Sequence, residues 1–125
     1  MTPDEILEVD AERNRPKGVT AGRLRAAINQ DHQQGGQLVR QGDTLVAFRA
    51  TAKGVVTFQY FNAAPPAELL KNIEATMQML KKVGAKSAQM TYKHPEAVDL
   101  FKRLAKSFDV SIDEQTGTKT ATVRL

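Results

Sequence analysis

The chain has 125 residues, of which 41% are hydrophobic and 26% are charged, and this composition is typical of one ordinary globular domain. It contains no cysteine, which excludes disulfides, thiolate metal sites and thiol nucleophiles and favours a reducing compartment. No apolar run approaches the roughly 20 residues that a membrane helix needs. We therefore expect a single domain over residues 1–125, placed in the cytoplasm.

Two helices are expected at the start of the chain. Thr2 can cap a helix over residues 3–14, because Glu5 stands three positions later and completes a capping box. Thr20 can cap a second helix, which the Gly35-Gly36 pair would end.

Three strands follow, recognised by the alternation of apolar and polar side chains and by the turns between them. They are expected over residues 37–41, 44–50 and 55–61, with turns at Gly42 and Gly54. This pattern predicts an antiparallel meander.

The next segment predicts a strongly amphipathic helix that Pro65 and Pro66 begin and Gly84 ends. Apolar residues recur along it at spacings of three and four. The stripe expected to face the core consists of Leu69, Leu70, Ile73, Met77, Leu80 and Val83.

The last third of the chain is expected to form a strand, a helix and a hairpin. The strand covers residues 86–92, the helix begins at Pro95, and the hairpin joins residues 108–114 and 118–125 about Gly117. The inner face expected for the hairpin consists of Phe108, Val110, Ile112, Ala121, Val123 and Leu125.

This order of elements resembles the GNAT acyltransferase superfamily over nearly the whole chain. The segment from His94 to Leu104 is similar to the family's Asn-x-x-Ala-x-x-Leu-Tyr-x-Lys segment, and Phe108 matches the aromatic residue that follows it. The resemblance implies an α/β fold whose central mixed sheet has about six strands, flanked by four helices. The family's first strand has no counterpart, so the strand over residues 37–41 would leave a sheet edge open to another chain.

The resemblance also locates the family's cofactor loop, which binds the pyrophosphate of acetyl-CoA with a glycine-rich turn before the long helix. The matching stretch, residues 61–68, has no glycine, two prolines without an N–H donor and the acidic Glu68 in the first helical turn. We do not expect the usual pyrophosphate binding here. The remaining candidates for binding the cofactor are Asn62, Ala63, Ala64 and Ala67.

The family commonly uses a tyrosine in its fourth helix to protonate the departing thiolate, and the matching position holds Phe101. Tyr92, at the end of the preceding strand, is the remaining candidate for a catalytic acid. His32 and His94 have no second ligand at metal spacing, so no metal site is expected.

We therefore expect a GNAT-like domain without acetyltransferase activity, which acts through protein contacts and resembles the virion-associated or host-modulating proteins of tailed phages. This interpretation predicts no cofactor, a protein partner or homo-oligomer, no membrane, and a place in the cytoplasm or in a virion. The alternative is an acyl-CoA-dependent N-acetyltransferase with an atypical cofactor loop, which would bind acetyl-CoA.

Positive charge is concentrated between residues 81 and 106, where seven basic residues stand against two acidic ones. This stretch indicates either a phosphate-bearing partner or a solvated, lysine-rich face. A basic nucleic-acid-binding protein is therefore a third interpretation, although no known nucleic-acid module matches. The basic residues are Lys81, Lys82, Lys86, Lys93, Lys102, Arg103 and Lys106.

Overall fold

The structure is a computed structural model that describes residues 1–93 and 95–125. His94, which belongs to the segment similar to the GNAT family, lies outside the described residues. The helices and strands follow one another in the predicted order, and their bounds agree with the prediction to within two residues. They are α1 (Pro3–Asn14), α2 (Ala21–Gln33), β1 (Gln37–Gln41), β2 (Thr44–Ala52), β3 (Val55–Asn62), α3 (Pro66–Lys82), β4 (Ser87–Tyr92), α4 (Pro95–Leu104), β5 (Asp109–Gln115) and β6 (Thr118–Arg124).

The strands form one mixed sheet of six strands in the order β1-β2-β3-β4-β6-β5, with β1 and β5 at its edges. Neighbouring strands are antiparallel except for β3 and β4, which are parallel. The parallel pair is short, because residues 55–57 of β3 pair with residues 87–89 of β4 and the ladder then stops. The two strands are therefore unpaired with each other towards their carboxyl ends.

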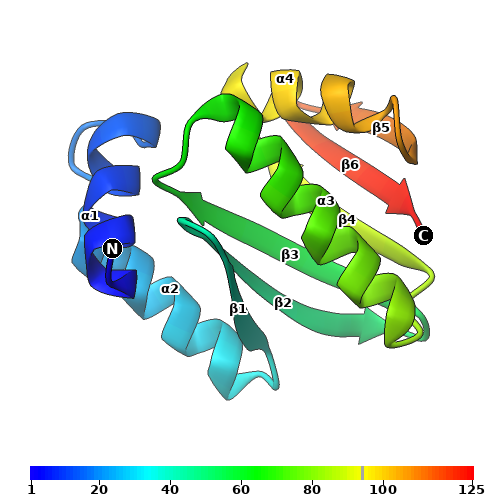
Figure 1. Cartoon of the computed structure of the whole chain (residues 1–125), viewed down its shortest axis with the longest axis horizontal. Coiled ribbons are helices and arrows are strands. Elements are labelled where there is room, and N and C mark those ends of the chain that lie inside the picture. Colours follow the sequence, from blue (N-terminus) through cyan, green and yellow to red (C-terminus); the bar gives the residue numbers. More distant parts are fainter. Residues whose placement is uncertain (94) are drawn as a thin grey trace.

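Helices cover the sheet from both sides (Figure 1). In this view α3 lies across the front of the sheet, α4 lies above it, and α1 and α2 stand together on the left. Successive side chains of β2 point to opposite faces of the sheet, and both faces are covered by helices. Val46 packs in the core under α3 and α4, while Leu45 and Ala47 pack under α1 and α2. This two-sided cover explains why β2 begins with a continuous buried run.

The predicted helix starts are present in the structure. The side chain of Thr2 accepts a hydrogen bond from the backbone N–H of Glu5, and the Glu5 side chain accepts one from the N–H of Thr2. Thr20 caps α2 by accepting a hydrogen bond from the N–H of Arg23. None of the helices in the described residues is both long enough and apolar enough to cross a membrane.

Most of the predicted stripe on α3 faces the core, but the prediction for its last member is wrong. Ile73, Met77 and Leu80 have no exposed surface, whereas Val83 is 73% exposed. The helix ends at Lys82, and Gly84 then turns the chain with a positive φ of 96°. Val83 therefore belongs to the helix cap, where the helical spacing no longer directs its side chain inward.

The predicted inner face of the hairpin also needs one correction. Ala121 and Val123 on β6 are fully buried, but Ile112 on β5 is 48% exposed. β5 is the edge strand, so the cover that α4 gives to the sheet does not extend over all of it. Phe108 and Val110 are partly buried against the core.

Candidate functional site

A pocket lies where β3 and β4 part. The ladder between the strands stops at Thr57 and Gln89, and the pocket of about 290 Å³ follows it towards the carboxyl ends of both strands. Its walls combine the ends of β3 and β4, the end of α1 and the start of β6. The lining residues are Arg15, Gln59, Tyr60, Met90, Thr91, Tyr92, Lys93 and Thr118.

Side chains from the end of α1 bind the free edge of β3 beside this pocket. Asp10 is fully buried, and its carboxylate accepts a hydrogen bond of 2.9 Å from the backbone N–H of Asn62. Asn14 donates to the backbone carbonyl of Asn62 at 3.0 Å, and Arg15 donates to the carbonyl of Tyr60 at 3.0 Å. These contacts satisfy backbone groups that the interrupted ladder leaves without a strand partner.

Arg15 is held in place by an ion pair and by an aromatic ring. Its Nε donates to the Asp10 carboxylate at 2.8 Å, and its guanidinium lies 5.4 Å from the centroid of the Phe61 ring. The buried carboxylate is thus compensated by a paired cation and two further donors, which is what burial of a charge requires.

Tyr60 points a buried hydroxyl group into this region without a hydrogen-bond partner among the described residues. Burial above all, and then the negative charge of Glu96, raise the pKa of Tyr60 far above its ordinary value, while Arg15 opposes the shift. The phenol therefore stays protonated at any working pH. A buried donor without a protein partner is rare in folded proteins and calls for a partner from outside the chain, such as a water molecule or a ligand.

Tyr92 and Phe101 stack against each other at the other wall of the pocket. Their ring centroids are 5.1 Å apart, and both side chains are at least 95% buried. Phe101 is the residue that the sequence resemblance matches to the family's tyrosine, and the stacking brings the ring of Tyr92 next to it. Burial, and then the charge of Glu114, raise the pKa of Tyr92 above its ordinary value, which keeps the hydroxyl group protonated at neutral pH.

The predicted cofactor loop is a tight turn in which most donors already have partners. The backbone N–H of Ala63 donates to the carbonyl of Asp43, and the N–H of Ala64 donates to the side chain of Asn62. Asn62 is buried and also bonds the carbonyl of Ala64 and the hydroxyl of Thr44. A role of Asn62, Ala63 and Ala64 in cofactor binding stays a prediction.

Ala67, the fourth residue predicted for the loop, lies in the first turn of α3. No side chain caps the start of this helix. The groove between this turn and α4 has a volume of only about 70 Å³ and is lined by Pro66, Leu69, Glu96, Asp99, Leu100 and Arg103.

No protein-family model matches the sequence, and no curated protein matches it either. Solved structures match its fold. The ribosomal-protein-alanine N-acetyltransferase from Brucella melitensis is 7% identical with a TM-score of 0.60, and the match covers 97% of this chain and 93% of that one. A GNAT superfamily phosphinothricin acetyltransferase from Sinorhizobium meliloti, in complex with acetyl-CoA, is 10% identical with a TM-score of 0.60 over 99% and 85% of the two chains. The PaiA N-acetyltransferase from Thermoplasma acidophilum, in complex with coenzyme A, is 8% identical with a TM-score of 0.58 over 98% and 90%.

The chain has the GNAT fold. This confirms the fold class that the order of elements predicted, with six strands in a mixed sheet and four flanking helices. At such low identities the likeness concerns the fold and assigns no activity to this chain.

The comparisons overturn the expectation of a non-catalytic GNAT-like domain that acts through protein contacts in a phage. The matching structures named above are acetyltransferases, and two of them hold acetyl-CoA or coenzyme A. The expectation that no cofactor binds loses its support for the same reason, and nothing in these structures points to a phage. The findings favour the alternative, an acyl-CoA-dependent N-acetyltransferase.

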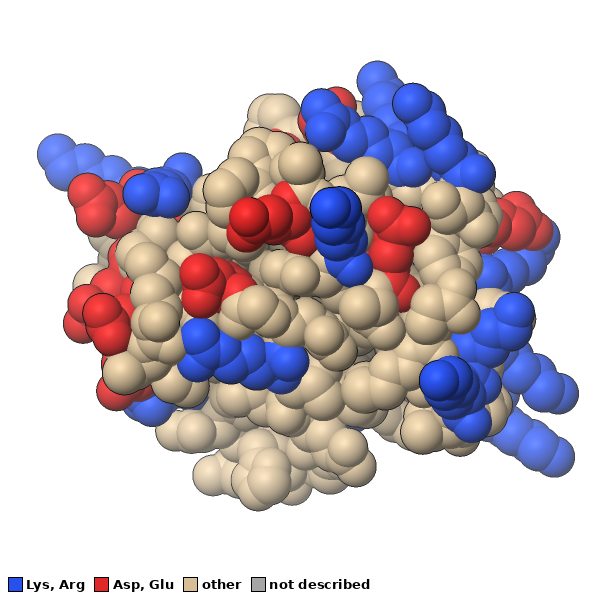
Figure 2. All heavy atoms as spheres, in the orientation of Figure 1, with Lys and Arg blue, Asp and Glu red and all other residues tan. Residues whose placement is uncertain are grey.

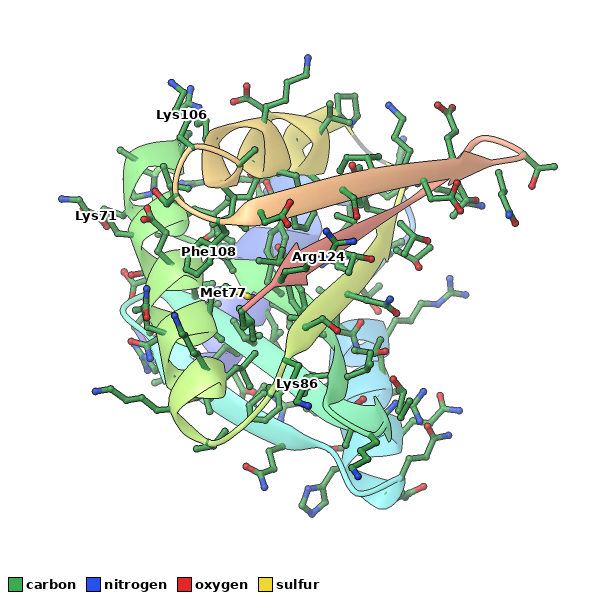
Figure 3. The ribbon with its side chains drawn as sticks, turned by 90° about the vertical axis from the view of Figure 1, so that its right-hand side faces the viewer. Lys71, Met77, Lys86, Lys106, Phe108 and Arg124 are labelled. Carbon is green, nitrogen blue, oxygen red and sulfur yellow. The ribbon has the colours of Figure 1, made fainter. Side chains whose placement is uncertain are left out.

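The predicted basic residues do not form one patch on the GNAT fold. Lys93 follows β4 and lies on the pocket, Lys102 lines a hollow beside Tyr92, and Arg103 lines the groove between α4 and the first turn of α3. Lys81, Lys82, Lys86 and Lys106 lie around the opposite end of the molecule, at the end of α3, before β4 and after α4. Figure 3 faces that end and shows Lys86 and Lys106 on opposite sides of it, with Arg124 between them in the view. Among the described residues, no lysine takes part in an ion pair. A phosphate-bearing partner for this end stays a prediction.

Sequence reasoning missed Asp10, Arg15 and Tyr60. A signal for Asp10 was present, because it stands four positions after the fully buried Ile6 and therefore on the same face of α1. A carboxylate on the apolar face of a helix indicates a buried polar contact. Tyr60 gave no such signal, since it fits the alternation of β3 as an ordinary core residue.

Proposed function

We propose that the protein is a GNAT-type acyltransferase that moves an acetyl group from an acetyl-CoA-type thioester to an amine, in the pocket between β3 and β4. The observation that carries this proposal is the early end of the parallel ladder, after which the two strands part around a pocket walled by Tyr60 and Tyr92. Structures of the same fold with acetyl-CoA and coenzyme A bound support it.

The donor supplies an acetyl group activated as a thioester. In the transfer, the amine nitrogen forms a bond to the carbonyl carbon, the carbon–sulfur bond breaks, and one proton moves in net terms from nitrogen to sulfur. The protein therefore needs a group that can hold a proton beside the sulfur and release it there.

Tyr92 is the residue to which we assign this proton. Its ring lies against Phe101, which takes the place of the family's tyrosine, and its raised pKa keeps the proton on the hydroxyl oxygen at neutral pH. The hydroxyl donates its proton to the departing sulfur and recovers one that the amine nitrogen loses, so the group ends the cycle unchanged.

Tyr60 and the side chains from α1 are assigned supporting parts. The unpartnered hydroxyl of Tyr60 is a hydrogen-bond donor fixed inside the site, and its strongly raised pKa makes it a donor that does not give up its proton. Asp10, Asn14 and Arg15 hold the edge of β3 in place, which keeps the pocket open beside the strand.

Two measurements test the proposal. Calorimetric titration with acetyl-CoA measures binding, and a second assay detects the free thiol released in the presence of a panel of amines. We expect saturable binding and an amine-dependent release of thiol. The absence of binding at millimolar acetyl-CoA, with the protein folded by circular dichroism, would contradict the proposal.

A further inference from the structure

The edge strand β5 leaves one side of its backbone and an apolar side chain uncovered. It pairs with β6 on one side, and no described strand pairs with its other side. Ile112, at the midpoint of β5, is 48% exposed. In Figure 3, β5 runs across the face that is turned to the viewer, and no other helix or strand is drawn over it. An open strand edge that carries an apolar side chain is a template for pairing with a further strand.

A largely apolar hollow of about 270 Å³ lies beside Ile112, between β5 and α4. Val98 and Ala105 of α4 contribute to its lining, and so do Val110 and Ile112 of β5. Tyr92 lines both this hollow and the pocket between β3 and β4. A partner that covers the hollow would therefore exclude water from the side of the Tyr92 ring that faces away from the pocket.

The strand and the helix that border the hollow carry opposite charges. β5 contains three carboxylates and no basic residue. Figure 2 shows basic side chains gathered at the top of the view, where Figure 1 places α4. Two carboxylates of β5 already face a cation of the same chain, because Asp109 is paired with Arg124 at 3.0 Å and Glu114 lies directly opposite Lys119 on β6.

Lys102 is a cation of α4 that the hollow leaves without a partner. It lines the hollow and forms no ion pair within the part of the chain that the structure describes. Arg103, the other basic residue in the last turn of α4, is paired with Asp99 at 3.3 Å. The hollow therefore fits a partner that carries a carboxylate close to an apolar side chain. A second copy of β5 offers this combination in Ile112 and Glu114.

A second copy of β5 fits beside the first in an antiparallel register centred on Ile112. This register places the two Ile112 side chains opposite each other and Val110 opposite Glu114 of the partner subunit, with no two carboxylates directly opposite. A shift of the centre by one residue towards the start of β5 would set Asp109 opposite Asp113. A shift towards its end would set the two Asp113 side chains against each other. Like charges directly opposite destabilise a strand pair, so the carboxylates favour the register centred on Ile112.

We propose that β5 pairs with β5 of a second copy of this chain, about a two-fold axis at Ile112, so that the two sheets join into one. Residues directly opposite in a strand pair share a face of the sheet. Glu114 of the partner subunit therefore comes to lie beside Val110, on the face that holds the hollow and Lys102. Ile112 of the partner subunit covers the exposed Ile112. The interface lies outside the pocket between β3 and β4 and does not depend on acyl transfer.

The other edge of the sheet offers less to a second copy. β1 has five residues against seven in β5, and its exposed Leu38 borders a smaller hollow of about 160 Å³. Its charged residue, Arg40, is bound within its own turn, to the carbonyl of Gly42 and to the carboxylate of Asp43. Leu38 is 42% exposed, close to the 48% of Ile112, so it provides a matched control on the opposite edge.

A single introduced cysteine tests the register directly, because the chain has no cysteine of its own. Opposite residues in an antiparallel pair have Cα atoms about 4.5 to 5.5 Å apart, which suits a disulfide. Ile112→Cys should therefore crosslink with itself under mild oxidation, which a non-reducing gel detects as a doubled mass. Leu38→Cys should crosslink at least about 10-fold more slowly, since it depends on random collision. Equal rates for the two variants would overturn the proposal.

Sedimentation equilibrium measures the association without a crosslink. The chain has a mass of 13.8 kDa, and we expect the measured mass to approach twice this value as the protein concentration rises. The expected dissociation constant is on the order of 10 μM, as for a small interface. A monomer at about 300 μM, which is far above this constant, would overturn the proposal.

Aspartate at each edge then locates the interface. Ile112→Asp should weaken the dimer by at least about 10-fold, because it sets two carboxylates against each other on the axis. Leu38→Asp should change the dissociation constant by less than about twofold. Lys102→Glu should also weaken the dimer, since it would then face Glu114 of the partner subunit. A dimer that survives Ile112→Asp, or that Leu38→Asp dissociates instead, would overturn the proposal. Thermal melting of each variant verifies that it is folded.

Discussion

The carboxylate of Asp10 on α1 accepts a hydrogen bond from the backbone N–H of Asn62 at the end of β3, across 52 residues of chain. The same carboxylate also accepts hydrogen bonds from the side chains of Asn14 and Arg15. One fully buried side chain therefore joins the first helix to the strand that borders the pocket. The position of α1 and the shape of the pocket are therefore coupled through Asp10.

Replacement of Asp10 by alanine should destabilise the protein by about 3 to 5 kcal/mol, because it leaves Arg15 and the N–H of Asn62 without their buried partner. Urea unfolding followed by circular dichroism measures the free energy of unfolding. Glu8→Ala on the exposed side of the same helix is the control and should change this value by less than about 0.5 kcal/mol. Equal costs for the two variants would contradict the coupling.

Tyr92→Phe should lower kcat by about 100-fold and change KM little, because the substitution removes a proton donor and keeps the ring that stacks on Phe101. Steady-state kinetics of thiol release provides both constants. A variant with unaltered kcat would assign the proton to another group.

Tyr60→Phe should keep the folded protein as stable as before or raise its free energy of unfolding by up to about 1 kcal/mol, because the lost hydroxyl is buried without a partner. Chemical denaturation checks this value. A cost of several kcal/mol would show that the hydroxyl is bonded in the folded protein. The same variant should bind acetyl-CoA more weakly, since the ligand then loses a donor.

Glu96→Gln should stabilise the protein at pH 7 by less than about 1 kcal/mol, with the gain vanishing below about pH 4. Burial first, and then Asp10, raise the pKa of Glu96 above its ordinary value of 4.5, while Arg15 opposes the shift. Tyr60, Asp99 and the Arg103 that pairs with Asp99 are further ionisable groups near it. The folded protein therefore binds the proton more tightly than the unfolded chain, and stability falls as the pH rises from 4.5 through the native pKa. Unfolding at a series of pH values checks this sign, and a gain that grows towards low pH would contradict it.

Leu80→Ala should destabilise the protein by about 2 to 5 kcal/mol, because this side chain of α3 is fully buried in the core and its loss leaves a cavity. Val83→Ala, three residues later, should cost less than about 0.5 kcal/mol, since Val83 is exposed. Thermal unfolding of both variants tests whether the apolar stripe ends where the helix ends.

The fold was predictable because its signals are local. Thr2 with Glu5, Pro65 and Pro66 at the start of α3, and the glycines after α1, α2 and α3 act on their near neighbours in the chain. The sequence pattern therefore locates these elements directly. Val83 shows the limit of this reasoning, since spacing alone does not reveal that the helix has already ended.

The site was less predictable because it is assembled from distant parts of the chain. Arg15 binds the carbonyl of Tyr60, 45 residues away, and no periodic pattern records such a pairing. Tyr92 was identified through the resemblance to the family, whereas the missing partner of the Tyr60 hydroxyl becomes visible only in three dimensions. The resemblance indicated that Phe101 replaces the family's tyrosine, and the structure shows that the ring of Tyr92 stacks on Phe101.

The brief parallel ladder between β3 and β4 also has a consequence for how the molecule unfolds. In the part of the chain that the structure describes, the strands of the first half of the sheet are joined to those of the second half by the pairing of residues 55–57 with 87–89. Hydrogen bonds from the N–H groups of Lys86 and Ser87 to the carbonyl of Gly54 extend this short ladder. A ligand that forms hydrogen bonds with both β3 and β4 beyond Thr57 and Gln89 would connect the two strands where they are not paired with each other. A bound ligand would then raise the melting temperature, and it would also make the β1-β2-β3 and β4-β6-β5 parts of the sheet unfold together as one cooperative unit.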